Sequence, residues 1–149
     1  AIALAAAATG SVATAVVLPR VLRRVSDRAA MLTGAAVLAA ALTAVAAVPS
    51  YAALLLTWLV LGIGLALVQT PAGRLIQRSA DPEELPPLFA AQFALSHLCW
   101  LVTYSVAGVL GAAIGVTNVT LILAAICAAA GMVAARVWKH DASAPVPQA

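Results

Sequence analysis

The sequence predicts an all-α protein whose long helices form a bundle within a membrane. Three observations support this fold class. The chain has 149 residues, of which 64% are hydrophobic and only 9% are charged, whereas soluble domains contain about one quarter charged residues. Several apolar stretches are long enough to cross a bilayer. The few charged residues gather at alternate ends of these stretches.

A transmembrane helix needs about 20 mainly apolar residues. Five stretches meet this requirement, at residues 1–18, 29–48, 51–72, 88–113 and 117–137. They define a transmembrane region over residues 1–139, followed by a polar segment, 140–149, that we expect to be a disordered cytoplasmic tail. A soluble protein with buried helices, the alternative, explains neither the lengths nor the placement of charge.

Charged residues occur only in alternate connectors. The connectors near residues 49–50 and 114–116 have none, whereas the other two connectors and the C-terminal segment hold them all. These residues are Arg20, Arg23, Arg24, Asp27, Arg28, Arg74, Arg78, Asp81, Glu83, Glu84, Arg136, Lys139 and Asp141. Basic residues mark the cytoplasmic side of a membrane protein. We therefore expect a multi-pass protein of the plasma (inner) membrane with a cytoplasmic C-terminus.

Residues 81–84, "DPEE", lie in the second charged connector. Asp81 as N-cap and Glu84 three residues later fit a capping box, which predicts a one-turn helix. A solvated acidic loop is the alternative.

Composition and motifs argue against other functions. A net charge of +3 is carried by too few residues for nucleic-acid binding. Cys99 and Cys127 lie inside apolar runs and lack metal-ligand spacing, so we interpret both as small buried residues and expect neither metal nor cofactor. The spans hold no paired carboxylates and the chain has no H-E-x-x-H, G-x-S-x-G or phosphate-loop motif. No catalytic residue is therefore expected, and an enzyme is disfavoured.

The first charged connector carries the pair Asp27 and Arg28, preceded by Arg20, Arg23 and Arg24. It resembles the cytoplasmic loop between the second and third helices of each half of major facilitator superfamily transporters, although the family's usual glycines around the aspartate are absent. The order of spans and loops is similar to helices eight to twelve of that twelve-helix fold. The chain also begins without Met or a basic n-region, so we expect a fragment of a longer transporter.

This resemblance implies a secondary active transporter of small molecules, with an exporter-like character and an alternating-access mechanism. Its partners would be the lipid bilayer, a small-molecule substrate and the remaining N-terminal helices of the same transporter. The resemblance also implies that Asp27 and Arg28 make charge-pair and helix-end contacts that help to hold the outward-facing state. Two alternatives stay open: the loop only anchors the topology, or the protein is a non-transporting membrane scaffold that assembles through small-residue helix faces.

The span at 88–113 has a polar and aromatic face. With about 100° of turn per residue, this face occupies an arc of about 140°, and the opposite side is aliphatic. Its residues are Gln92, Phe93, Ser96, His97, Trp100, Thr103 and Tyr104. Polar groups in a span face the protein interior or water, so we expect this face to line a substrate cavity; packing against neighbouring helices is the alternative. His97, the only ionisable residue well inside a span, is a candidate for proton coupling.

Several smaller features concern packing. The apolar run at 51–72 is interrupted near its inner end by Gln69, Thr70 and Pro71. Gln69 is a further candidate for the cavity, and a gate or a helix end are the local alternatives. Gly62 and Gly64 predict a bend or a tight helix crossing. Gly111 and Gly115 predict a close helix approach. A small polar patch at residues 9–14 either borders a cavity or packs.

Overall fold

The computed structural model describes residues 1–48 and 50–138, and that part of the chain folds into α-helices joined by short turns. The helices are α1 (Ile2–Val21), α2 (Asp27–Val45), α3 (Tyr51–Ser79), α4 (Leu85–Ile114) and α5 (Val116–Val137). All five are long and apolar enough to cross a membrane. The prediction of an all-α transmembrane bundle with five spans is thus confirmed. The expected tail at 140–149 lies outside the described residues.

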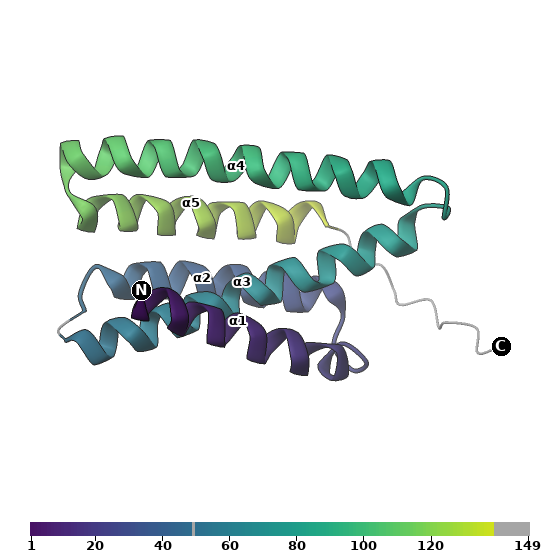
Figure 1. The fold of residues 1–149 in the computed structure, drawn as a ribbon, viewed down its shortest axis with the longest axis horizontal. Helices are drawn as coiled ribbons and strands as arrows, with labels where there is room; N and C mark the ends of the chain where they lie inside the picture. Colours follow the sequence, from purple (N-terminus) through teal and green to yellow (C-terminus); the bar gives the residue numbers. More distant parts are fainter. Residues whose placement is uncertain (49, 139–149) are drawn as a thin grey trace.

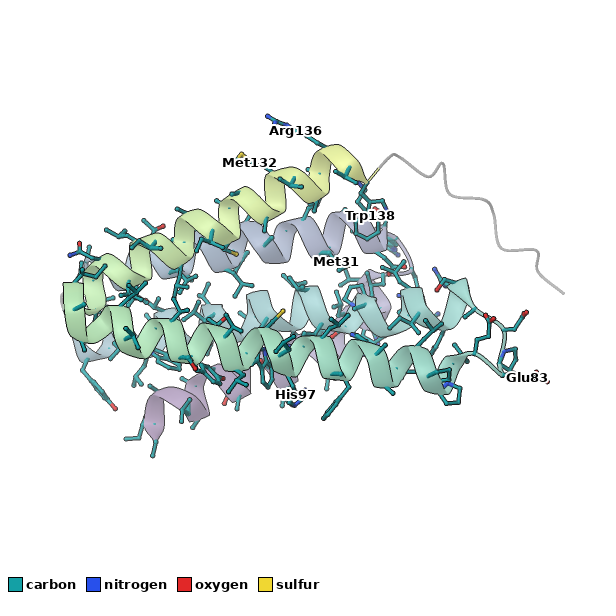
Figure 2. All side chains as sticks on the ribbon, turned by 90° about the horizontal axis from the view of Figure 1, so that it is seen from above. Met31, Glu83, His97, Met132, Arg136 and Trp138 are labelled. Carbon is teal, nitrogen blue, oxygen red and sulfur yellow. The ribbon has the colours of Figure 1, made fainter. Side chains whose placement is uncertain are left out.

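The helices form a layered bundle built around α3. This helix contacts α1, α2 and α4, while α5 contacts both α2 and α4 (Figure 1). The α1–α2 turn, the α3–α4 turn and the C-terminal end of α5 lie together at one end of the bundle (Figure 1). Every charged side chain of the described residues belongs to this end, which we call the charged end. Glu83 marks it in Figure 2.

Serine residues start two of the helices. The hydroxyl oxygens of Ser26 and Ser50 accept hydrogen bonds from the backbone N–H groups of Ala29 (3.2 Å) and Ala53 (3.3 Å). Each bond satisfies a donor that has no partner within its own helix. The Ser26 cap makes Asp27 the first residue of α2, where a carboxylate is favoured by the helix dipole.

Glycine allows α1 and α3 to touch backbone to backbone. A Cβ on Gly62 would overlap the carbonyl group of Ala7, and one on Gly10 would overlap the carbonyl oxygen of Leu59. The Ser11 hydroxyl donates a hydrogen bond to the Gly62 carbonyl oxygen at 2.9 Å. Gly62 therefore marks a tight crossing, and the polar patch of the first helix contributes to packing at Gly10 and Ser11.

A second crossing joins α2 to α3. A Cβ on Gly34 would lie 2.9 Å from the Gly64 carbonyl oxygen, and one on Gly64 would lie 2.8 Å from Leu38 Cγ. Both distances are too short for real Cβ contacts. Gly64 thus also belongs to a tight crossing. The sequence predicted either a bend or such a crossing at this position.

A different face of α2 packs on α5. A Cβ on Gly131 would lie 3.2 Å from Ala35 Cβ, and the Cys127 thiol approaches the Ala35 carbonyl oxygen at 3.5 Å. Cys127 is half-buried, whereas Cys99 is exposed on α4. The expectation that both cysteines are buried was therefore wrong for Cys99, because α4 has few neighbours.

The expected close approach at Gly111 and Gly115 does not occur within the described residues. Apart from their own sequence neighbours, no described atom lies within 4 Å of a Cβ placed at either position. Gly115 instead makes the turn between α4 and α5, where its φ of 84° is a conformation that favours glycine.

The charged connector between α3 and α4 is shorter than the sequence suggested. Helix α3 continues past Pro71, which is fully buried, and ends at Ser79, so the helix-end interpretation of this region was wrong. Residues 82–84 form a turn and no separate helix. The Glu84 N–H bonds to the Asp81 carbonyl oxygen at 2.9 Å, and α4 starts at once with prolines in its first turn.

Replacing Gly62 by alanine is expected to lower the free energy of unfolding by about 1–3 kcal/mol, because the new methyl group would overlap the α1 backbone. Gly73→Ala is the matched control in the same helix, since its Cβ would meet open space. That change should leave stability unchanged or raise it by up to about 1 kcal/mol. Unfolding midpoints of the purified proteins in detergent test this, and equal midpoints for the two variants would contradict the crossing.

Candidate functional site

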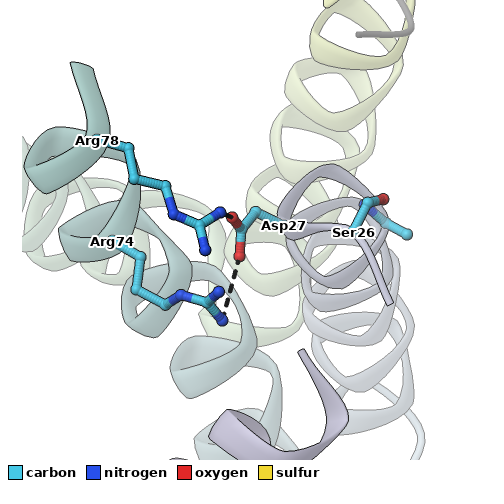
Figure 3. Close-up of polar contacts among 5 residues, drawn as sticks. Ser26, Asp27, Arg74 and Arg78 are labelled. Carbon is cyan, nitrogen blue, oxygen red and sulfur yellow. Dashed lines mark hydrogen bonds and ion pairs between the residues drawn. The ribbon is translucent and has the colours of Figure 1, made fainter. Parts of the chain in front are cut away.

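Asp27 is the centre of an ion-pair cluster at the charged end. Its carboxylate lies 3.6 Å from the Arg74 guanidinium and 3.3 Å from that of Arg78 (Figure 3). The Asp27 side chain is 10% exposed, against 30% for Arg74 and 58% for Arg78. The cluster therefore joins the first turn of α2 to the last turns of α3 through a nearly buried carboxylate.

The arginines of this cluster come from one face of α3. Arg74 and Arg78 are four residues apart, so they lie one above the other on a continuous helix. Arg78 donates a hydrogen bond to Oδ2 of Asp27. The other oxygen, Oδ1, is buried and has no hydrogen-bond partner in the described structure, and the Arg74 charge lies closest to it. Arg74 thus offsets the cost of burying that oxygen.

Arg28, the next residue, turns to a different helix. Its Nε donates to the Trp138 carbonyl oxygen at 3.1 Å and its Nη2 donates to that of Ala135 at 2.7 Å. The last carbonyl groups of a helix have no intrahelical partners and carry the negative end of the helix dipole. A guanidinium group supplies both hydrogen-bond donors and positive charge there. Arg28 therefore links α2 to the C-terminal end of α5 through two hydrogen bonds.

The Asp27–Arg28 pair makes both kinds of contact that the resemblance implied, charge pairs and a helix-end contact. The role of these contacts in holding a transport state stays a prediction. Sequence reasoning missed Arg74 and Arg78 as the partners, since both were placed in a loop. Their four-residue spacing was the available signal, and it needed α3 to extend past residue 72.

Arg20, Arg23 and Arg24 do not join this cluster. Their side chains are exposed at the end of α1 and in the following turn, where they line an open pocket together with Val21 and Val25. Among the described residues, no carboxylate lies within ion-pair distance of these three arginines. Thus, in the described structure, only Asp27 and Arg28 of the predicted loop motif form ion pairs or hydrogen bonds with other helices through their side chains.

The predicted cavity face lies on α4, a helix without any buried residue. Gln92 is half-buried, whereas the other members are exposed; the exposed fraction is 65% for Phe93, 43% for Trp100 and 70% for Tyr104. Ser96 and Thr103 are likewise exposed. No hydrogen bond or ring contact in the described structure joins this face to another helix, which does not support the packing alternative within this chain.

His97 lies near the middle of α4 (Figure 2). Its Nδ1 is 2.8 Å from the Phe93 carbonyl oxygen, and its ring lies between those of Phe93 (3.8 Å between centroids) and Trp100 (5.3 Å). A carbonyl oxygen can only accept, so Nδ1 must carry hydrogen. In the neutral ring Nε2 is then free to accept a hydrogen bond from a ligand.

Gln69 is exposed on α3 and makes no hydrogen bond with the α4 face in the described structure. Its place in a cavity, like that of the α4 residues, stays a prediction. Within residues 1–48 and 50–138, no group of three or more His, Cys, Asp or Glu side chains could hold a metal ion.

Comparison with known proteins decides the family. The family model described as Major Facilitator Superfamily matches residues 1–149. The chain belongs to this superfamily. No curated protein and no solved structure matches the sequence. Superfamily members are transporters, not enzymes. The matched chain is therefore an integral, multi-pass membrane transport protein, as its sequence predicted.

Replacing Arg74 by glutamine is expected to lower the free energy of unfolding by about 1–3 kcal/mol, because it leaves a buried carboxylate oxygen of Asp27 without its nearest charge. Arg78→Gln should cost less, since Arg78 is more exposed. In the Asp27→Asn background the Arg74 effect should nearly vanish, which a double-mutant cycle measures. Arg136→Gln, an exposed arginine on the outer side of α5 (Figure 2), is the neutral control. Additive effects of the Asp27 and Arg74 changes would refute the pairing.

Proposed function

We propose that the chain forms part of a secondary active, exporter-like transporter that moves small molecules by alternating access. The observation that carries this proposal is the polar and aromatic face of α4. It runs along a membrane-spanning helix of a transporter family, yet no other described helix covers it.

The chemistry of this face suits an aqueous cavity. Lipid tails offer no hydrogen-bond partners, so polar groups in a span need protein, water or ligand. The Ser96 hydroxyl and Nδ1 of His97 donate to carbonyl groups one turn earlier in α4. The phenol of Tyr104 and the indole N–H of Trp100 have no such partner among the described residues. In a cavity they would bond to water or substrate.

The aromatic members suggest the class of substrate. Phe93, His97 and Trp100 follow one another along α4 with their rings in contact or close. Aromatic faces bind flat rings by stacking and cations through their negative π-electron density. A flat, cationic molecule would meet both conditions.

Other helices of the same transporter would complete the cavity. Transporters of this kind bind substrate near the bilayer midplane, between two related halves. The aliphatic side of α4 is also uncovered, with Leu95 63%, Leu98 56% and Val102 54% exposed. We propose that N-terminal helices cover one side of α4 and that lipid covers the other.

The contacts of Asp27 and Arg28, which we call the clamp, would hold three helix ends together during the transport cycle. They connect the ends of α2, α3 and α5, so these helices would move together when the cytoplasmic side opens and closes. We propose that this clamp favours the outward-facing state, with the charged end and the C-terminus in the cytoplasm. The one-sided distribution of arginine supports this orientation in a plasma (inner) membrane.

A scaffold that assembles through small-residue faces is the second candidate. The glycines at the α1–α3 and α2–α3 crossings are already used within the chain. Gly73 on α3 and Gly108 and Gly111 on α4 meet open space, so they are small residues that a partner could still contact. Such a scaffold would show no substrate flux.

Alanine at Trp100 or Tyr104 is expected to reduce efflux at least several-fold without lowering protein abundance, because each side chain would contact substrate. Ethidium, a flat aromatic cation, is the probe, and its efflux is measured in cells that carry the complete transporter. Leu98→Ala and Val102→Ala, on the opposite side of α4, are the controls. A flat scan, or losses that follow abundance, would leave the face without a role in transport.

Single cysteines test the orientation in a background that lacks Cys99 and Cys127. Cysteine at Ser79, at the charged end, should react only with membrane-permeant thiol reagents in intact cells. Cysteine at Ala47, beside the uncharged α2–α3 turn, should react with impermeant reagents from outside. The opposite labelling pattern would place the C-terminus outside and reject the proposed topology.

A further inference from the structure

Arg20, Arg23 and Arg24 form a second basic site that the Asp27 cluster does not use. Together with Val21 and Val25 they line an open pocket where α1 passes into the α1–α2 turn. All three arginines are exposed, and the two valines are 41% and 39% exposed. The pocket thus combines concentrated positive charge with an apolar patch.

Local folding fixes this arrangement. Leu18 and Leu22 are buried, 3% and 7% exposed, and pack with Ala30 of α2 in one apolar cluster. The backbone continues past the helix end in a tight turn, in which Arg24 and Val25 donate N–H bonds to the Val21 carbonyl oxygen at 2.9 and 3.0 Å. Because Leu22 points inward, the neighbouring arginines are presented outward on one side of the last turn.

The three arginines of this pocket have no negatively charged partner among the described residues. Arg74 and Arg78 are paired with Asp27, and Arg28 is bound to the carbonyl groups of α5. Arg20 and Arg24 instead line the same pocket, where like charges repel each other. A negative group from outside the chain would remove that repulsion. The positive-inside rule explains which side these arginines occupy, but it does not require them to share a pocket.

We propose that this pocket binds the phosphate of an anionic phospholipid head group in the leaflet next to the charged end. The pocket lies at the end of a membrane-spanning helix, where head groups are found. Guanidinium groups bind phosphate oxygens in pairs of hydrogen bonds, and basic pockets beside transmembrane helices recognise acidic head groups. Val21 and Val25 would contact the first carbons of the acyl chains. The inference requires only that these helices span a membrane, and it is independent of the proposed transport activity.

The test uses the full chain, reconstituted in nanodiscs of phosphatidylcholine with a minor fraction of phosphatidylglycerol. Native mass spectrometry measures how strongly each lipid is retained. We expect phosphatidylglycerol to be retained in preference to phosphatidylcholine. Arg23→Gln and Arg24→Gln should each lower that preference about fivefold. Arg136→Gln, which removes an exposed arginine at the same end but outside the pocket, should leave it unchanged.

Three results would overturn the proposal. One is equal retention of the two lipids by the unmodified protein. Another is a loss in Arg136→Gln as large as that in Arg24→Gln, which would indicate diffuse attraction to the surface. The third is displacement of phosphatidylglycerol by millimolar inorganic phosphate, which would identify free phosphate as the ligand. Single substitutions keep most of the connector charge, and circular dichroism of each variant checks that the helices are intact.

Discussion

Close backbone contact of α3 with α1 and α2 is the constraint on which the rest of the bundle depends. Lipid tails are as apolar as leucine, so helices in a membrane associate by packing and hydrogen bonding instead of hydrophobic burial. Gly62 and Gly64 are two residues apart, or about 200° around the helix. They therefore face opposite sides of α3, and α1 packs on one side while α2 packs on the other. Two glycines thus determine where three helices lie.

The same packing determines which partners the Asp27–Arg28 pair can reach. Asp27 and Gly34 are seven residues apart, about two turns, so both point toward α3. Arg28 and Ala35 have the same spacing and both point toward α5, where Ala35 meets Gly131 and Arg28 binds the last carbonyl groups. Each of these polar contacts thus lies on a face of α2 that also packs closely on the same neighbouring helix through a small residue, Gly34 for α3 and Ala35 for α5. The order of the two residues matters: exchanging them would present each charge to the wrong helix.

The sequence alone was sufficient for features that depend on composition and local spacing. Apolar length identified the five helices, and the mid-span glycines Gly62 and Gly64 predicted a bend or a tight crossing, of which the structure shows the crossing. It was insufficient where tertiary context decides. Arg74 and Arg78 became partners of Asp27 because α3 stays helical past a buried proline, which local rules disfavour. Gly111 and Gly115 have the spacing of a packing motif, but no atom of another described helix lies within 4 Å of a Cβ placed at either position. Residue spacing shows that a close contact is possible, whereas the position of a partner cannot be read from it.

Helix α4 differs from α1, α2 and α3 in this respect, because no glycine of α4 meets another helix. Its hydrogen bonds from Ser96 and His97 go to carbonyl groups one turn back, which an isolated helix can form without a neighbour. Those bonds satisfy the Ser96 hydroxyl and Nδ1 of His97, and no other described helix covers the rings of His97, Phe93 and Trp100. The Trp100 N–H and the Tyr104 hydroxyl have no equivalent bond in the described structure, and each would cost several kcal/mol, on the order of a lost hydrogen bond, if it faced lipid tails. That cost disappears in a hydrated cavity, so the face of α4 that carries these groups is the one that should be turned toward water and substrate.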